Sequence, residues 1–228
     1  MNVANLIDDI FAQVKKSLVG LPFGEMAAGK IIIPDGPAIT RETKISGNVQ
    51  SVEVFGQFDV VVEKEQTLNG EAQIHVIASE NVQNIMALSS KNGVLRISLE
   101  NNTSVKGPAP KVHVKVSAFN ALTSFGNSTL EVHVGKFDDL HLGLTGNSTV
   151  KLRGNGDQFA VSIMGISLVD AGGLEVNRAT VDVTGNSSIE GITVNQKLFT
   201  KLLGAATVAY KGTPQVVNAT TQGEVRKI

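Results

Sequence analysis

The chain has 228 residues, of which 42% are hydrophobic, so it can bury a continuous core. Its net charge is −1, its sequence pI is about 6.4 and only 4% of its residues are aromatic, which excludes the basic and base-stacking surfaces of nucleic-acid-binding proteins. The absence of cysteine excludes disulfides, cysteine nucleophiles and thiolate metal sites, and no apolar run reaches the ~18 residues of a membrane span.

Residues 2–19 are predicted to form an amphipathic helix. Its apolar residues recur at helical spacing, and they are Leu6, Ile7, Ile10, Phe11, Val14 and Leu18. Gly20 and Pro22 end the helix. We expect it to cover the open strand edges at one end of the fold, and the alternative is a helix that binds a membrane surface or a partner. Asp8 and Asp9 stand where a signal peptide would be basic or apolar, so no clear signal peptide is expected.

The next part of the chain predicts an irregular β region. Residues 1–43 are assigned to the helix and a connection with one short strand at 30–33, and residues 44–228 to a β domain. Within 44–118 the expected strands are 52–55, 58–63, 73–78, 85–91, 94–99 and 111–117. Asn92-Gly93 is a hairpin signal, which predicts antiparallel pairing in this first half.

A repeat dominates residues 119–228. Six glycines follow one another in steps of 20, 19, 20, 19 and 19 residues, and they are Gly126, Gly146, Gly165, Gly185, Gly204 and Gly223. A fixed period near twenty is typical of a solenoid. Twenty extended residues give about 65 Å of chain, enough for one slim coil, and neighbouring coils would pair in parallel about 4.8 Å apart. The sequence therefore predicts an all-β fold: a parallel β-helix of ~19–20 residues per coil, preceded by an antiparallel β-rich half and a capping helix.

Columns aligned on the glycines define the predicted faces. The column four residues after each glycine is apolar and should be buried, and it holds Leu130, Val150, Val169, Ile189 and Val208. Two columns are expected to face water. The one three residues before the glycine holds Thr123, Gly143, Ser162, Asp182 and Lys201, and the one five after it holds Glu131, Lys151, Asp170, Glu190 and Ala209.

Four blocks of the sequence resemble the bacterial family known as the putative auto-transporter adhesin head domain, or head GIN domain. They are SVEVFGQFDVVVEK, IHVIASENVQNIMALSSKNGVLRISLENN, PKVHVKVSAFNALTSFGNSTLEV and GAATVAYKGTPQVVNATTQGEVRKI, the last with Tyr210, Gly212 and Pro214 in a Tyr-x-Gly-x-Pro pattern. The resemblance covers about residues 44–228. It implies a right-handed β-helix, a place in the periplasm or at the cell surface, and an adhesion role without catalysis.

An enzymatic function is the main alternative to an adhesin. Some parallel β-helices are pectate-lyase-like enzymes, and the column with Glu131, Asp170 and Glu190 could in principle hold an acid/base pair or Ca²⁺. Because Lys151 lies among these acids, alternating charge pairing is the favoured interpretation. The four histidines lack metal-ligand spacing and are expected on surface strands, so no cofactor or metal is predicted. An envelope regulatory module that binds a protein partner is a further alternative.

The turn after each glycine supplies the candidate ligand-binding residues. An asparagine and then a serine follow three of the glycines, giving Asn127, Asn147 and Asn186 with Ser128, Ser148 and Ser187. Amides and hydroxyls repeated along one edge can bind sugar hydroxyls, so the expected partner is a glycan or a protein at the cell surface. The sequence leaves the oligomeric state open.

Overall fold

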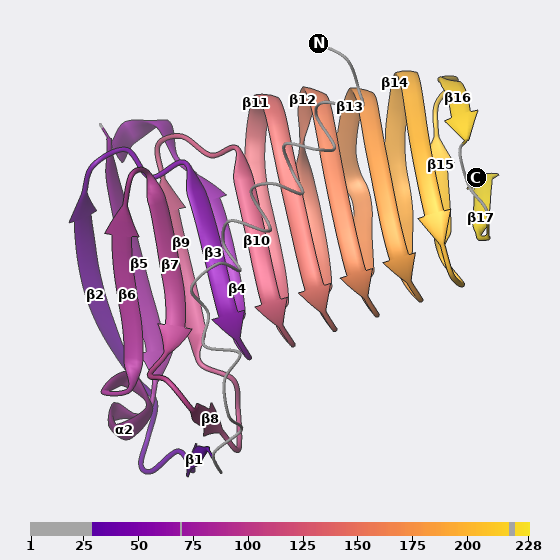
Figure 1. Ribbon diagram of the computed structural model, residues 1–228. Helices are drawn as coiled ribbons and strands as arrows, with labels where there is room; N and C mark the ends of the chain where they lie inside the picture. The colour runs from indigo at the N-terminus through magenta and orange to yellow at the C-terminus, as the bar shows by residue number, and fades with distance from the viewer. Residues whose placement is uncertain (1–28, 69, 219–221) are drawn as a thin grey trace.

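The computed structural model describes residues 29–68, 70–218 and 222–228. The helix predicted at 2–19 lies outside these residues. The described chain is almost entirely strand (Figure 1). The strands before the repeat are β1 Lys30–Ile32, β2 Ile39–Ser46, β3 Ser51–Gly56, β4 Asp59–Lys64, β5 Glu71–Ala78, β6 Met86–Lys91, β7 Val94–Leu99, β8 Thr103–Val105 and β9 Lys111–Val116. Two single-turn helices, η1 Gln66–Leu68 and α2 Glu80–Gln83, lie between them.

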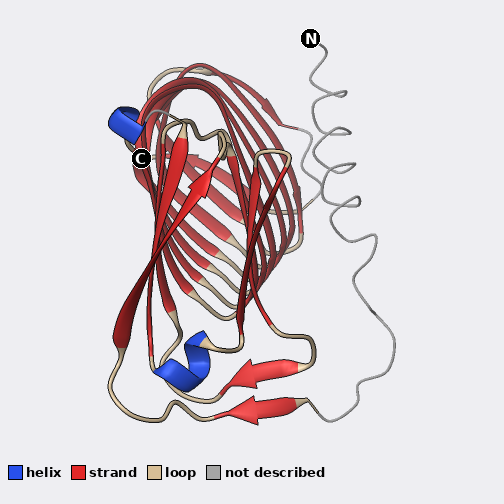
Figure 2. Cartoon of the chain, turned by 90° about the vertical axis from the view of Figure 1, so that its left-hand side faces the viewer, coloured by secondary structure: helices blue, strands red, loops and turns tan. Residues whose placement is uncertain are grey.

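The repeat forms a stack of coils, which confirms the predicted β-solenoid. Its strands are β10 Ala121–Gly126, β11 Thr129–Gly146, β12 Thr149–Gly165, β13 Leu168–Gly185, β14 Ser188–Leu203, β15 Thr207–Lys211, β16 Gln215–Asn218 and β17 Glu224–Lys227. All pairs among them are parallel, as expected when each coil lies on the one before it. Figure 2, which looks at the end of the stack where β2 and β6 lie, shows the nested coils around a common interior.

Each glycine corner divides its coil into two walls. The leading wall contains the strands that run into the corner, and its stacking order is β6, β7, β3, β10, then the second halves of β11, β12, β13 and β14. The following wall contains the strands that leave the corner, in the order β2, β5, β9, β4, then the first halves of β11 to β14, β15 and β17. The two walls face each other across the core.

The corners require glycine for two reasons. Gly146 has φ of 113°, a conformation that L side chains rarely adopt, and a Cβ there would lie 2.4 Å from the carbonyl oxygen of Gly126 in the coil before. That carbonyl accepts a hydrogen bond from the Asn147 N–H at 3.0 Å, so the same close approach links successive corners. The glycine period is thus a direct consequence of the stacking.

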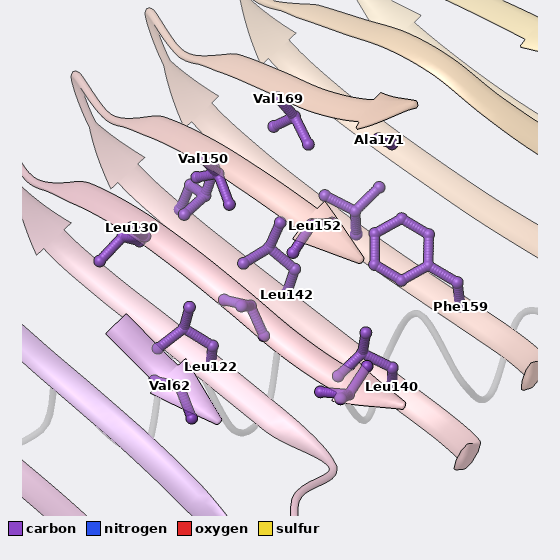
Figure 3. Packing of buried hydrophobic residues seen from close by; sticks show 14 of the residues in the cluster. Val62, Leu122, Leu130, Leu140, Leu142, Val150, Leu152, Phe159, Val169 and Ala171 are labelled. Atoms are coloured by element: carbon purple, nitrogen blue, oxygen red, sulfur yellow. The ribbon is translucent and has the colours of Figure 1, made fainter. Parts of the chain in front are cut away.

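The predicted apolar column fills the core. Leu130 is 1% exposed, while Val150, Val169, Ile189 and Val208 are each 0% exposed, and they stack along the axis as expected. Figure 3 shows Leu130, Val150 and Val169 on successive strands, with Leu122 and Leu142 of the leading wall nearby. Aliphatic side chains of similar shape repeat at each level, so every coil buries its apolar face only against its neighbours.

The stack extends further towards the N-terminus than the period predicted. β10 pairs in parallel with β3, and β11 pairs in parallel with β4, so residues 51–64 form a coil beneath residue 119. Gly56 takes the corner position under Gly126, 70 residues away in sequence. Beyond it, β7 and β9 also pair in parallel with β3 and β4. The predicted antiparallel pairing is confined to the end of the stack: β2 with β5, β5 with β9, and the β6–β7 hairpin at Asn92-Gly93.

Three local predictions need correction. β2 and β8 fall in segments that were predicted as connections, and they form because each finds a partner strand far away in sequence, β5 and β1 respectively. Gly223 does not take the corner column, because β17 pairs with β15 so that Glu224 lies beside Thr207. The Glu224 N–H then bonds the Ala206 carbonyl, and Gly223 occupies the place of the small residue two positions after a corner.

Candidate functional site

The corner that follows each glycine brings the predicted asparagines to the surface. Asn127, Asn147 and Asn186 are exposed. Within residues 29–68, 70–218 and 222–228 their side-chain amides make no hydrogen bond, so the three asparagines do not bond one another along the axis there. Each amide keeps its donor and acceptor groups for water or a ligand.

The serines of the same corners face inward. Ser128, Ser148 and Ser187 are 3%, 4% and 4% exposed. The Ser187 hydroxyl donates to the carbonyl of Gly165 at 3.1 Å and accepts from the Ser167 N–H at 2.9 Å. The Ser128 hydroxyl likewise donates to the Gly56 carbonyl at 3.1 Å. The Ser128 and Ser187 hydroxyls therefore satisfy backbone groups of the preceding coil. They fix the corners from which the asparagine side chains project.

A shallow groove of about 450 Å³ runs along four successive corners. Two of the predicted asparagines, Asn147 and Asn186, stand on either side of Ile166, which interrupts the asparagine column. Leu168 and Ala205 add further apolar lining. Asn127 and Ser128 lie outside this groove. Among the described residues no charged side chain lines the groove, so a neutral ligand suits it better than an ionic one.

The apolar part of the groove was not predicted as part of a site. Ile166 is 60% exposed and Leu168 is 48% exposed, and Met164 on the other side of the same corner is 45% exposed. The sequence signal was present, because Ile166 replaces the expected asparagine. From the sequence alone, this replacement indicates only an interruption of the Asn-Ser pattern. In the structure it provides an apolar surface between two free amides.

The following wall carries the predicted row of alternating charge. Glu131, Lys151, Asp170 and Glu190 lie beside one another on successive strands, as the alignment required. The Lys151 ammonium lies 4.0 Å from a carboxylate oxygen of Glu131, and Glu190 pairs with Arg226 at 3.4 Å. Ala209, the fifth residue of that column, lies beside Glu190 as predicted but is buried instead of exposed.

Three histidines join this charged wall. His133 contacts Glu131 at 3.0 Å and Glu63 at 3.8 Å, and His113 lies 3.6 Å from Glu63. The hydrogen bond from His133 is the main cause that lowers the pKa of Glu131. His75 pairs with Glu42 at 3.8 Å. Glu42, Glu63, Glu131 and Glu190 therefore have cationic or imidazole partners, which is a structural use of their charge, whereas Asp170 accepts a hydrogen bond from the Gly172 N–H.

The leading wall corrects the second predicted outward column. Gly143, Ser162 and Asp182 are buried, although they alternate with the core residues and point away from the core. Burial raises the pKa of Asp182, and the Lys201 ammonium 3.5 Å away opposes that rise. His141, predicted as a surface residue, also lies on this wall, and burial lowers its pKa.

The described residues show no arrangement typical of an active site. Asp182 is a carboxyl with a raised pKa, but its recorded partner is Lys201, whereas glycoside hydrolysis needs a second carboxyl across the scissile bond. Among the described side chains, no group of three or more His, Asp or Glu could hold a metal ion. No helix in the described ranges is long and apolar enough to cross a membrane.

Comparison with known proteins gives the family. The profile of the family described as "putative auto-transporter adhesin, head GIN domain" matches residues 48–214. The chain belongs to this family. The match covers β3 to the residues before β16, so the head GIN domain corresponds to the solenoid together with its antiparallel end. No curated protein matches the chain in sequence.

Solved structures share the fold at low sequence identity. A "putative adhesin" from Bacteroides fragilis matches with a TM-score of 0.68 and 18% identity, covering 86% of this chain and 100% of that one. One from Parabacteroides distasonis has a TM-score of 0.64 and 17% identity, covering 87% and 100%. A "putative lipid binding protein" from the same species has a TM-score of 0.58 and 18% identity, again covering 87% and 100%. At these identities the matches establish the fold alone.

Proposed function

We propose that the chain is a non-enzymatic, adhesin-type β-helical scaffold of the cell envelope or surface, and that it binds a neutral glycan along the glycine corners. Membership of the head GIN family supports the adhesin role and the location. The observation that carries the glycan proposal is the corner groove, where the free amides of Asn147 and Asn186 stand on either side of the exposed Ile166.

The geometry suits a sugar for two reasons. Asn147 and Asn186 are separated by two coil spacings, which is about 10 Å, close to the length of a disaccharide. A pyranose presents hydroxyls at its rim and C–H groups on its faces. The amides can bind the sugar hydroxyls, and Ile166 and Leu168 can contact the C–H groups on the faces of the ring. Ser187 supports the site because its hydroxyl bonds the backbone of the preceding corner, Ser148 lies buried beneath the groove, and Asn127 extends the row of amides by one coil.

A panel of immobilised neutral and acidic glycans tests this proposal. The native chain should retain one or more neutral oligosaccharides, and Asn147→Ala or Asn186→Ala should weaken that binding at least tenfold. The matched control is Asn155→Ala, which removes an exposed amide from a position outside the groove. Asn127→Ala should have a smaller effect. Binding that is unchanged in the two groove variants, or that is restricted to acidic glycans, would exclude this site.

The absence of catalysis is tested with the same glycans. Each retained oligosaccharide should be recovered intact after long incubation, with and without Ca²⁺. Product formation that disappears in Asp170→Asn or Glu190→Gln would instead establish the pectate-lyase-like alternative.

A further inference from the structure

The outward positions of the leading wall have an unusual composition for a surface. From β10 to β14 they fall in three rows, which are Ala121, His141, Ala160, Thr180 and Phe199, then Thr123, Gly143, Ser162, Asp182 and Lys201, then Phe125, Thr145, Met164, Thr184 and Leu203. Within these three rows only Asp182 and Lys201 carry an ordinary charge, whereas the next outward row, nearer the start of this wall, is polar and mostly charged, with Asp139, Gln158, Arg178 and Lys197. Small side chains occupy the middle, with Phe125, Phe199 and Leu203 around them, which is typical of a packed face rather than a solvated one.

Burial agrees with this composition in the middle of the face, whereas Met164 and Leu203 beside the corners are 45% and 50% exposed. Ala160 is 3%, Ser162 is 8% and Asp182 is 5% exposed. The principal described contacts of β12, β13 and β14 are with the neighbouring coils, and such lateral pairing leaves outward side chains uncovered. Asp170 provides the comparison, because it points outward from the same strand, β13, in the following wall and is exposed.

Two polar atoms on the wall point to the same conclusion. The Nδ1 of His141 is buried without a hydrogen-bond partner among the residues that the structure describes, and the buried Oδ2 of Asp182 has the Lys201 ammonium at 3.5 Å as its ion-pair partner. Buried polar groups in proteins nearly always have a partner. Both atoms can therefore form a further hydrogen bond with a group that lies over this wall.

We propose that the chain's own residues 2–19 dock on the outward face of the leading wall, as an amphipathic helix that runs across the coils. This interaction lies on a different surface from the proposed glycan groove and does not depend on it. It also replaces the expectation that the helix closes an end of the stack, because the antiparallel strands β2 and β6 already form one end.

The dimensions fit this occupant. A helix of 18 residues is about 27 Å long. The leading wall from β3 to β14 spans five strand spacings, or about 24 Å. Residues 20–29 can extend about 33 Å from β1, which lies with β8 below the first coils in Figure 1. The predicted apolar stripe with Ile7, Ile10 and Phe11 would then contact a face of small and apolar side chains.

The lack of native cysteine allows a direct test with single thiols in the full-length chain. Ala160→Cys reports on the leading wall, and Thr149→Cys, at an exposed position of the following wall, is the reference. Maleimide labelling of Ala160→Cys should be at least tenfold slower than that of Thr149→Cys. Adding Phe11→Asp, which places a charge in the apolar stripe, should remove most of this protection. The matched control is Ala12→Asp, which adds the same charge on the opposite side of the predicted helix and should leave labelling slow.

Circular dichroism of each variant verifies that the solenoid remains folded. Fast labelling of Ala160→Cys in the parent chain would overturn the proposal. Protection that persists in the Phe11→Asp variant would overturn it as well. If that persistent protection is lost on dilution, the occupant is a second copy of the chain. If it is independent of concentration, the strands themselves close the wall.

Discussion

The outer faces of the two walls come from the same coils yet differ in chemistry. The following wall carries a charged row with Glu131, Lys151, Asp170 and Glu190. Within it, Glu131 and Glu190 pair with lysine, arginine or histidine. The leading wall presents small and apolar side chains, and it buries Asp182. Alternation along a strand determines which way a side chain points, but it does not determine whether water reaches that side chain. One wall is built to face solvent and the other to be covered.

A charge placed in the core, between the two walls, should cause the largest loss of unfolding free energy. Substitutions at outward positions should each cost less. Val169 is 0% exposed in the core, so Val169→Asp should destabilise the protein by about 4 kcal/mol or more, because a carboxylate would lose its hydration without a partner. Urea denaturation measures this. The control Thr149→Asp lies on the exposed following wall and should cost less than about 0.5 kcal/mol. A small loss for Val169→Asp would contradict the assignment of the core.

The same change on the leading wall distinguishes the two outer faces. Ser162→Asp should cost about 2 kcal/mol, because the new carboxylate would be buried directly beside Asp182. On an open strand face the substitution would resemble Thr149→Asp. Equal unfolding free energies for Ser162→Asp and Thr149→Asp would show that the leading wall is as accessible as the following wall.

The fold could be predicted from the sequence where one local rule repeats. The columns headed by Leu130 and Val169 were assigned correctly because period-two alternation and the glycine step agree. The coil at residues 51–64 was not predicted, since Gly56 lies 70 residues before Gly126 and its corner continues with Phe58 instead of a small residue. Only the folded stack reveals that Phe55 lies on Phe125, with ring centroids 4.8 Å apart.

The candidate site was only partly predictable for a related reason. A repeated Asn-Ser pair suggests a polar edge, but sequence periodicity does not tell an exposed amide from a buried hydroxyl in consecutive positions of a turn. The serine of each pair faces the preceding coil, as the Ser187 bond to Gly165 shows. Ile166 became relevant only when its 60% exposure between two asparagines was known.

The pH dependence of stability should have opposite signs on the two walls. Burial raises the pKa of Asp182 above its ordinary value of 3.8, so the folded state disfavours its charged form, and this cost appears as pH rises above 3.8. Asp182→Asn should therefore raise the melting temperature near neutral pH, and the gain should vanish below pH 3.8. Thermal denaturation across pH 3 to 8 would measure it.

Glu131→Gln is the matched variant on the following wall. The His133 hydrogen bond lowers the pKa of Glu131 below 4.5, so its ionised form contributes stability above that pH, which is lost as pH falls through the lowered pKa. The substitution should cause a small loss near neutral pH and no change in strong acid. The same sign of pH dependence in both variants would contradict the contrast between the walls.

Carboxyl footprinting of the native chain tests most directly whether the leading wall is covered. Carbodiimide coupling followed by mass spectrometry gives the labelling rate of each carboxylate, normalised to the rate in urea. Asp182 and Asp170 both point outward from β13, one on each wall. We predict that Asp182 is labelled at least tenfold more slowly than Asp170. Equal normalised rates would contradict the account, because the two outer faces would then be equally open to solvent.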